Sequence, residues 1–211
     1  MEIELQGELL QLLPQKAIYW DRTSTLVLSD LHLGKAGHFR KHGIPIPQKV
    51  HFDDLVNMTG LIEKHNPKRI IFLGDLFHSD LNAEWWAFID WLKHYPALNF
   101  ILVKGNHDII PEILFTHARI NFVENLEEGP FFFTHMREEH PTLYNLSGHI
   151  HPGAHLFGSG KQGLILPCFQ FCGSYGLLPA FGNFTGLAKV RPKSDDRVFV
   201  VADDRVIDVT R

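Results

Sequence analysis

The stretch IIFLGDLFHS at residues 70–79 decides how the rest of this sequence is interpreted. Residues Ile70 to Leu73 form a short apolar run of β-branched and aromatic side chains, which predicts a buried strand. Gly74 interrupts the run and places Asp75 at the carboxyl end of that strand, where open α/β sheets bind their ligands. Because a carboxylate in such a position can bridge two metal ions, we interpret Asp75 as the centre of a metal site.

Polar groups of the same kind follow other apolar runs. They are Ser29-Asp30-Leu31-His32, Gly105-Asn106-His107-Asp108, Thr134-His135 and Gly148-His149-Ile150-His151. In an extended backbone residues i and i+2 share a face, so Asp30 and His32 are expected to point into one pocket, as are His149 and His151. Oxygen and imidazole ligands together suit Mn, Fe, Zn or Co better than Ca. The pattern therefore predicts a dinuclear phosphoesterase centre.

The order of these motifs closely resembles the calcineurin-like metallophosphoesterase superfamily, whose pattern is DxH, GDxxH or GDxxD, GNHD or GNHE, H, and GHxH. The segment GDLFHS is the form seen in repair nucleases of the SbcD type. More narrowly, DLHLGKAGHFRKHGIPIPQ at 30–48 and LPAFGNFTG at 178–186 are similar to the bacterial DNA ligase-associated metallophosphoesterases. The resemblance implies an α/β fold, a four-layer α/β/β/α sandwich of two mixed sheets flanked by helices.

The resemblance also implies a role for each motif residue. One metal ion would be held by Asp30, His32, Asp75 and His151, and the other by Asp75, Asn106, His135 and His149. Two divalent ions, with Mn the first choice and Fe, Zn, Co or Ni as alternatives, would activate a water and stabilise charge on the phosphate oxygens. His107 would protonate the leaving oxygen, and His78 would help to position the substrate phosphate or the catalytic histidine. Asp108 would orient one of the histidines or cap a following helix.

Residues 33–48 show neither the hydrophobic periodicity of a helix nor that of a strand, and they contain the densest basic cluster of the chain. On spacing alone, such a cluster is interpreted as a solvated loop. Its position directly after two predicted metal ligands favours a contact with a phosphate backbone instead. Arg40 is the preferred contact because a guanidinium binds phosphate through two hydrogen bonds, and Lys41 lies beside it.

Periodicity predicts the surrounding elements. Residues 2–20 alternate as two or three antiparallel strands, residues 48–65 are typical of a helix, and Asn82 is placed to cap a second helix that ends before Pro96. Further strands are expected at 25–28, 99–103, 131–133 and 143–147. After His151 only strands are expected, at 164–171, 187–190, 198–202 and 206–209, as an antiparallel meander. This succession predicts two stacked sheets within a single domain of residues 1–211.

The composition is that of an ordinary globular enzyme, with 45% hydrophobic and 21% charged residues in a chain of 211. No segment approaches the roughly 20 apolar residues that span a bilayer, and MEIELQGELL carries no basic leader. A cytoplasmic protein without membrane contact is therefore expected. The net charge of −4 argues against broad attraction to nucleic acid, although two bound divalent ions would add positive charge at the site.

Three functions fit the sequence. The first is a metal-dependent phosphodiesterase acting on DNA, an endonuclease in DNA repair associated with a DNA ligase and a helicase. The second is a phosphodiesterase for cyclic or other small nucleotides. The third is a binding module that kept the fold and lost the chemistry, but the presence of His107 and of every predicted ligand favours an enzyme. A protein phosphatase is less favoured, because GDLFHS lacks the Arg of GDxVDRG.

Overall fold

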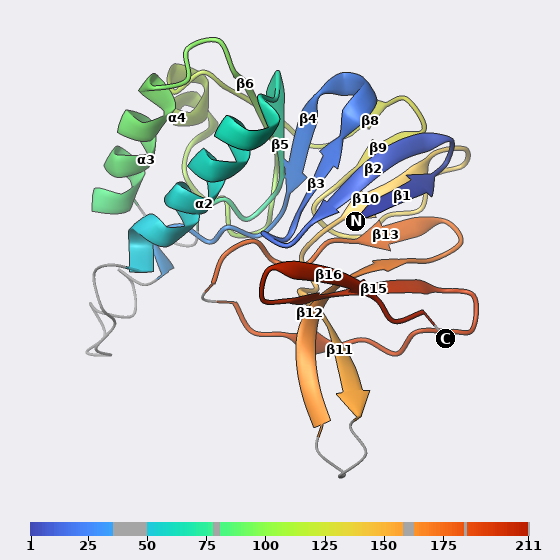
Figure 1. The fold of residues 1–211 in the computed structure, drawn as a ribbon. Coiled ribbons are helices and arrows are strands. Elements are labelled where there is room, and N and C mark those ends of the chain that lie inside the picture. The colour runs from blue at the N-terminus through green and yellow to red at the C-terminus, as the bar shows by residue number, and fades with distance from the viewer. Residues whose placement is uncertain (36–49, 78–80, 158–162, 184, 211) are drawn as a thin grey trace.

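The computed structural model describes residues 1–35, 50–77, 81–157, 163–183 and 185–210, and at 50–52 it describes the backbone alone. Two β-sheets are stacked face to face, and the described helices lie against the outer face of the first sheet (Figure 1). The chain completes the first sheet, with helices between its parallel strands, before it enters the second sheet. The predicted metal ligands come from both sheets.

The first sheet has seven strands in sequence order, so each strand lies beside the next one along the chain. The first to fourth strands pair antiparallel, and the fourth to seventh strands pair in parallel. Parallel neighbours bring their carboxyl ends to the same edge of the sheet. The strands are β1 (Glu2–Leu5), β2 (Glu8–Leu13), β3 (Ala17–Trp20), β4 (Thr25–Leu28), β5 (Arg69–Leu73), β6 (Asn99–Val103) and β7 (Ile120–Val123).

Helices connect the parallel strands of this sheet. They are α2 (Val50–His65), α3 (Ala83–Lys93) and α4 (Glu112–His117), with the short 3-10 helix η1 (Asp21–Thr23) before β4. The side chain of Asn82 accepts hydrogen bonds from the backbone N–H groups of Glu84 and Trp85, at 2.8 and 3.2 Å. This contact confirms the predicted cap of α3, which satisfies two N–H groups that have no partner within the helix.

The second sheet has nine strands, in the order β14-β11-β12-β13-β10-β9-β8, with β15 on β12 and β16 on β15. The pairs β9–β10, β10–β13 and β11–β14 are parallel, and the remaining pairs are antiparallel. The strands are β8 (Leu126–Glu128), β9 (Phe131–Phe133), β10 (Tyr144–Ser147), β11 (Pro152–Phe157), β12 (Gly163–Phe171), β13 (Tyr175–Leu177), β14 (Ala188–Lys189), β15 (Arg197–Ala202) and β16 (Arg205–Asp208).

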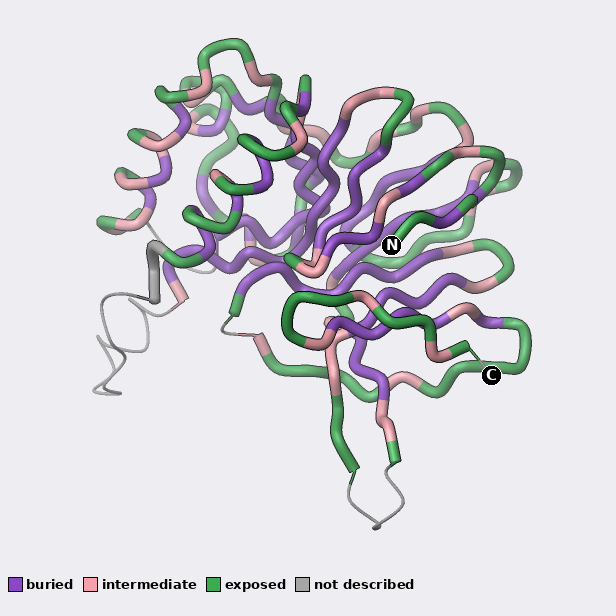
Figure 2. Tube along the Cα trace, viewed as in Figure 1, coloured by how far each residue is buried: buried purple, intermediate pink, exposed green. Residues whose placement is uncertain are grey.

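The alternation of side chains along β5 shows why its sequence is apolar at every position after Arg69. Ile70 and Phe72 pack under the helices, whereas Ile71 and Leu73 pack against the second sheet, and all four are fully buried. The strands at the centre of the molecule are therefore covered on both faces, as the buried segments in Figure 2 show.

The stacked mixed sheets with a helical layer confirm the predicted fold class. The described α-helices, α2, α3 and α4, all precede residue 118 and pack on the first sheet, so the described residues supply three of the four expected layers. On the outer face of β12 and β15 the described side chains instead form a small cluster of Cys168, Val198 and Val200, against which Val190 and Val209 pack. The expected antiparallel meander needs one correction, because β14 pairs with β11 in parallel.

Candidate metal centre

Loops at the carboxyl ends of five strands, β4, β5, β6, β9 and β10, carry the predicted ligands to one place between the sheets. The structure brings together two clusters of titratable side chains in which the potential ligand atoms lie within 4.8 Å of one another. Asp30, His32 and His151 form the first cluster, and Asp75, His135 and His149 form the second.

The backbone of this site adopts a conformation that the sequence did not predict. Five of the expected ligands have positive φ angles: Asp30 at 55°, His32 at 50°, Asp75 at 51°, His149 at 66° and His151 at 52°. The extended backbone expected for the two pairs of residues spaced by two is therefore wrong, since this is the left-handed region that L-residues rarely occupy. Such strain costs about 1–3 kcal/mol per residue and is typical of functional sites.

Hydrogen bonds between two loops hold the strained segments in place. The N–H of Asp30 donates to the carbonyl of Gly74 at 3.2 Å, and the N–H of His32 donates to the carbonyl of Asp75 at 2.9 Å. The loop after β4 therefore runs alongside the loop after β5, which fixes the first cluster next to the residue expected to bridge the two.

In the first cluster, the carboxylate of Asp30 is completely buried. Its Oδ2 accepts hydrogen bonds from Ser29 Oγ at 2.5 Å and from the N–H of His149 at 2.9 Å. No described residue donates a hydrogen bond to Oδ1, which lies 3.3 Å from His151 Nε2 and 3.9 Å from His32 Nε2. A buried carboxylate oxygen without a donor is unfavourable unless a cation faces it, so this cluster fits a metal ion.

The two imidazoles of the first cluster also suit a metal ion. The Nε2 atoms of His32 and His151 lie 3.2 Å apart, which is about the spacing of two nitrogens that share one ion. Burial lowers the pKa of His32 to about 3, despite the opposing charges of Asp30 and Asp75. His32 is therefore neutral at physiological pH, and neutral imidazole is the form that binds metals.

The second cluster converges on one ring nitrogen. His135 Nδ1 donates to the carbonyl of Leu73 at 2.8 Å, which leaves the lone pair of Nε2 facing the site. That Nε2 lies 3.0 Å from Asn106 Oδ1, 3.4 Å from Asp75 Oδ1 and 3.2 Å from His149 Nδ1. Oxygen and nitrogen atoms with lone pairs thus meet at one point, an arrangement that fits a second cation.

Asp75 lies between the two clusters. Its Oδ1 accepts the N–H of His107 at 2.9 Å and faces His135, whereas its Oδ2 lies 3.8 Å from His32 Nε2. Burial on its own would raise the pKa of Asp75, but its contact with His135 and the hydrogen bond from the N–H of His107 lower it to about 2. The carboxylate is therefore ionised and presents one oxygen to each cluster.

Asp108 has a different role from those expected. It neither orients a catalytic histidine nor caps the following helix, because its carboxylate accepts backbone hydrogen bonds from two loops. Burial raises the pKa of Asp108 to about 6, although these bonds favour its charged form. Oδ2 accepts from the N–H groups of Asp75 and Gly105, both at 2.9 Å, and Oδ1 accepts from those of Leu76 at 2.9 Å and Phe77 at 3.2 Å.

Ser29 is a site residue to which the sequence interpretation gave no role of its own. Its hydroxyl donates to Asp30 and lies so close to Gly148 that a Cβ there would be 1.6 Å from Oγ. The close approach explains why glycine precedes His149. Ser29 could have been identified only from its position directly before Asp30, because a serine at the end of a strand has many other uses.

The remaining predicted site residues lie in different parts of the structure. The ring of His107 is 5.8 Å from that of His32 and is partly exposed, so it lies at the open side of the first cluster. His78, Arg40 and Lys41 lie outside the described residues.

The sequence model of the family described as calcineurin-like phosphoesterase matches residues 23–164. The chain belongs to this family. The crystal structure of the Pseudomonas putida nuclease MPE is similar over 99% of both chains, with 32% sequence identity and a TM-score of 0.85. The phosphoesterase YfcE from E. coli is 14% identical over 88% of this chain and 98% of its own, with a TM-score of 0.42. No curated protein matches the chain.

Membership of this family, together with the geometry of the two clusters, makes the protein a metal-dependent phosphoesterase. The Asp and His side chains fit a dinuclear metal site, because each cluster offers its own set of ligand atoms and Asp75 faces both. Among the described helices, none is long and apolar enough to cross a bilayer.

Proposed function

We propose that this phosphoesterase is a phosphodiesterase that cleaves DNA with two bound divalent ions. The observation that carries the proposal is the position of Asp75, whose two oxygens face two separate ligand clusters. The 32% identity to a Pseudomonas putida nuclease over 99% of both chains supports a nucleic acid as the substrate, and the resemblance of residues 30–48 favours DNA.

The proposed ligands follow the two clusters, and manganese is the proposed metal because the set mixes carboxylate, amide and imidazole groups. Two such ions lower the pKa of a water and stabilise charge on the phosphoryl oxygens. Asp30, His32, Asp75 and His151 would hold one ion, and Asp75, Asn106, His135 and His149 would hold the other.

His107 is the proposed general acid. Its backbone N–H is bound to Asp75 Oδ1, which fixes the residue relative to the bridging carboxylate. Its ring stands beside His32 on the open side of the site, where a leaving oxygen can accept a proton from it. His78, which directly follows the loop held by Asp108, is proposed to position the substrate phosphate or His107.

A role in DNA repair, in association with a DNA ligase and a helicase, is proposed from the resemblance of residues 30–48 and 178–186. The second of these segments lies against the site, because the N–H of Phe181 donates to Ser29 and that of Gly182 donates to Asp30, at 2.8 and 3.1 Å. Calorimetric titration of the purified protein with a purified bacterial DNA ligase and with a helicase tests this association.

The proposed activity is tested on three substrates: single-stranded DNA, a cyclic nucleotide and a small chromogenic phosphodiester. We expect the protein to lose activity in a chelator and to regain DNA cleavage when Mn is added. Efficient hydrolysis of the cyclic nucleotide without cleavage of any DNA would assign the protein to small nucleotides. Binding of two metal ions without turnover of any substrate would instead indicate a binding module.

The basic loop provides a second test of the substrate. Arg40 and Lys41 are proposed to bind the DNA backbone, so replacing both with alanine should weaken DNA cleavage strongly. Hydrolysis of the chromogenic diester should remain nearly unchanged, because that substrate needs only the metal ions and His107. An equal loss on both substrates would show that the loop shapes the metal centre itself.

A further inference from the structure

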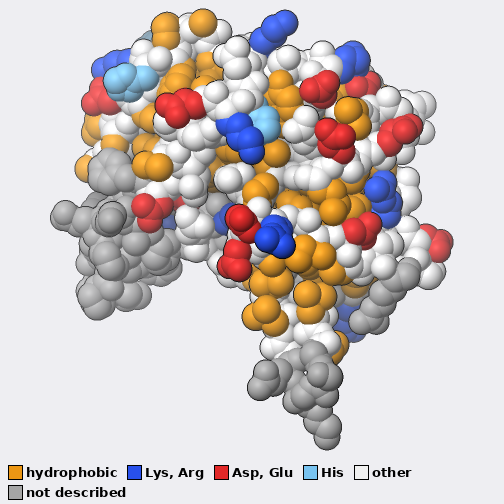
Figure 3. Space-filling view, viewed as in Figure 1, with side chains coloured by type: hydrophobic (Ala, Val, Ile, Leu, Met, Phe, Trp, Pro, Cys, Tyr) orange, Lys and Arg blue, Asp and Glu red, His pale blue; other side chains and the backbone are white. Residues whose placement is uncertain are grey.

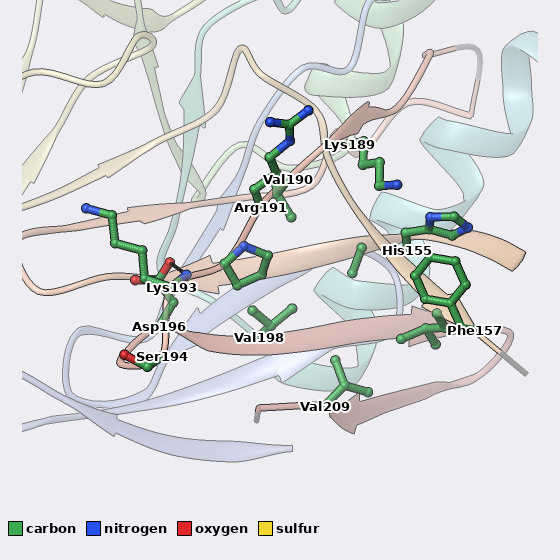
Figure 4. Close-up of a pocket in the computed structure, with 13 residues that line it drawn as sticks. His155, Phe157, Lys189, Val190, Arg191, Lys193, Ser194, Asp196, Val198 and Val209 are labelled. Carbon is green, nitrogen blue, oxygen red and sulfur yellow. Dashed lines mark hydrogen bonds between the residues drawn. The ribbon is translucent and has the colours of Figure 1, made fainter.

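A pocket of about 330 Å³ lies on the second sheet and shares no lining residue with the metal centre. Its apolar lining includes Val198 and Val209 (Figure 4). On the surface, hydrophobic side chains gather over β11 and β12, in the lower part of the view (Figure 3). Nothing in the proposed chemistry uses this pocket, and its polar rim has an unusual charge.

The rim is positively charged although the whole chain carries a net charge of −4. Lys189, Arg191 and Lys193 recur at every second position, line the pocket and are exposed. Within the described part of the chain, no carboxylate forms an ion pair with any of the three. The acidic residue of the pocket, Asp196, is buried and accepts hydrogen bonds from Gln170 Nε2 and from the N–H of Lys193, both at 2.9 Å.

An exposed aromatic side chain stands beside Lys189. Phe157 is 67% exposed. Its ring centroid lies 4.1 Å from the ring centroid of His155 and 5.8 Å from Lys189 Nζ. A flat ring next to a cation can stack on a base while the cation binds the neighbouring phosphate, and grooves for single-stranded nucleic acid use this combination. A pocket with only aliphatic side chains and cations would bind phosphates but would not favour the bases of a nucleic acid.

The basic segment begins next to the metal centre. The N–H of Ala188 donates to the carbonyl of His151 at 3.0 Å, and Lys189 stands opposite Gly153 on β11. Because a strand rises about 3.3 Å per residue, Phe157 lies roughly 20 Å along β11 from His151. A flexible DNA strand with one phosphate at the metal centre can therefore continue along β11 to the pocket.

We propose that β11 and residues 189–193 bind single-stranded DNA beyond the scissile phosphate. Lys189, Arg191 and Lys193 bind successive phosphates, and a base stacks on Phe157. The inference rests on the proposed function, because it names a second contact surface for the same substrate. It also explains how a protein with a net negative charge retains a polyanion, since the affinity comes from a local row of cations.

The test compares a long single-stranded oligonucleotide with the chromogenic diester as substrates in Mn. The variant replaces Lys189, Arg191 and Lys193 with glutamine. We expect kcat/KM for the oligonucleotide to fall at least tenfold and hydrolysis of the small diester to stay unchanged. The slope of log affinity against log salt concentration, measured in chelator, should become shallower by about 2, since three phosphate contacts on a single strand are lost.

A matched control distinguishes the loss of this surface from a general loss of positive charge. Replacing Lys64, Lys68 and Lys93 with glutamine removes the same charge from exposed positions on the helical side and should leave both substrates unaffected. Phe157→Ala should weaken oligonucleotide binding roughly fivefold or more without changing the salt slope, because it removes stacking and leaves the cations.

The outcomes distinguish the inference from the proposed function. If the wild type cleaves the oligonucleotide and the triple variant cleaves it equally well, the inference is overturned and the proposed function stands. Binding of the oligonucleotide through these residues without any DNA cleavage would overturn the function alone. Tighter binding of a labelled oligoglutamate than of the oligonucleotide would assign the pocket to an acidic protein partner and overturn the inference. An equal loss on both substrates would also overturn it.

Discussion

At Asp75 a single carboxylate serves both ligand clusters, so its removal should affect metal binding and turnover together. We expect Asp75→Ala to lose both metal ions and all activity, because each cluster keeps only its remaining ligands and the shared charge is gone. Metal content by mass spectrometry and turnover of the chromogenic diester check this prediction. A variant that keeps two metal ions per chain would show that Asp75 is not the bridge.

His107→Ala should behave differently, since His107 contacts Asp75 through its backbone N–H, which the substitution keeps. We expect both metal ions to remain bound and turnover to fall by roughly 10²–10⁴, the usual effect of removing a general acid. His94→Ala, an exposed histidine after α3, is the matched control and should retain full activity. Loss of metal from His107→Ala would contradict the division between metal binding and proton transfer.

The order of the motifs predicted which residues come together, because the carboxyl ends of neighbouring parallel strands meet at one edge. The order of the motifs could not predict the backbone conformation of those residues. A spacing of two is equally compatible with an extended strand and with the left-handed conformations that Asp30 and His32 adopt. Those conformations are imposed by contacts with Gly74 and Asp75, some 44 residues further along the chain, which no local pattern records.

Between elements, Asp108 joins the loop after β5 to the loop after β6 through four backbone hydrogen bonds. Asp108→Asn keeps one oxygen but turns an amide toward two N–H donors, so we expect the free energy of unfolding to fall by about 3 kcal/mol. Metal affinity should fall as well, because the loop that carries Asp75 loses its support. Urea denaturation and metal titration measure the two effects. Unchanged metal affinity in a destabilised variant would limit Asp108 to a folding role.

Elements covered on both faces were the easiest to predict from sequence. Strand β9, and strands β5 and β6 after their polar first residues, are apolar runs because side chains on both faces are buried. In contrast, β8 contains two glutamates and three residues in all, and β13 contains a glycine at its centre, so neither has a local signal. Both depend on pairing with neighbours already in the sheet, and such pairing is a property of the assembled molecule.

Across the whole molecule, one polar contact joins three distant parts. Lys16, in the turn between β2 and β3, donates to Asn183 Oδ1 at 3.4 Å, and Asn183 Nδ2 donates to Asp54 on α2 at 2.9 Å. Burial raises the pKa of Asp54 from 3.8 to about 6, against the opposing effects of Lys16 and Asn183. The folded state therefore prefers the protonated carboxyl. Its contribution to stability is complete below pH 3.8 and is lost as the pH rises through about 6.

We accordingly expect Asp54→Asn, which stays neutral and can still accept from Asn183, to be as stable as the wild type at pH 4. At pH 7 it should be more stable by up to roughly 3 kcal/mol, since one pKa unit corresponds to about 1.4 kcal/mol. Urea denaturation at both pH values, in chelator, checks the prediction. Asp53→Asn, at the exposed neighbouring position, is the control and should show no such change. An equal difference at both pH values would exclude titration of Asp54 as the cause.

The contact between Asp30 and the N–H of His149 spans 119 positions of the chain. On a ribosome that adds about 5–20 residues per second, His149 is made roughly 6–24 s after Asp30. Throughout that interval the growing chain lacks His149 and His151, so neither ligand cluster is complete. We therefore expect both metal ions to bind only after His151 has been made. The rate at which newly made protein becomes active should follow the docking of the second sheet and not the supply of metal during synthesis.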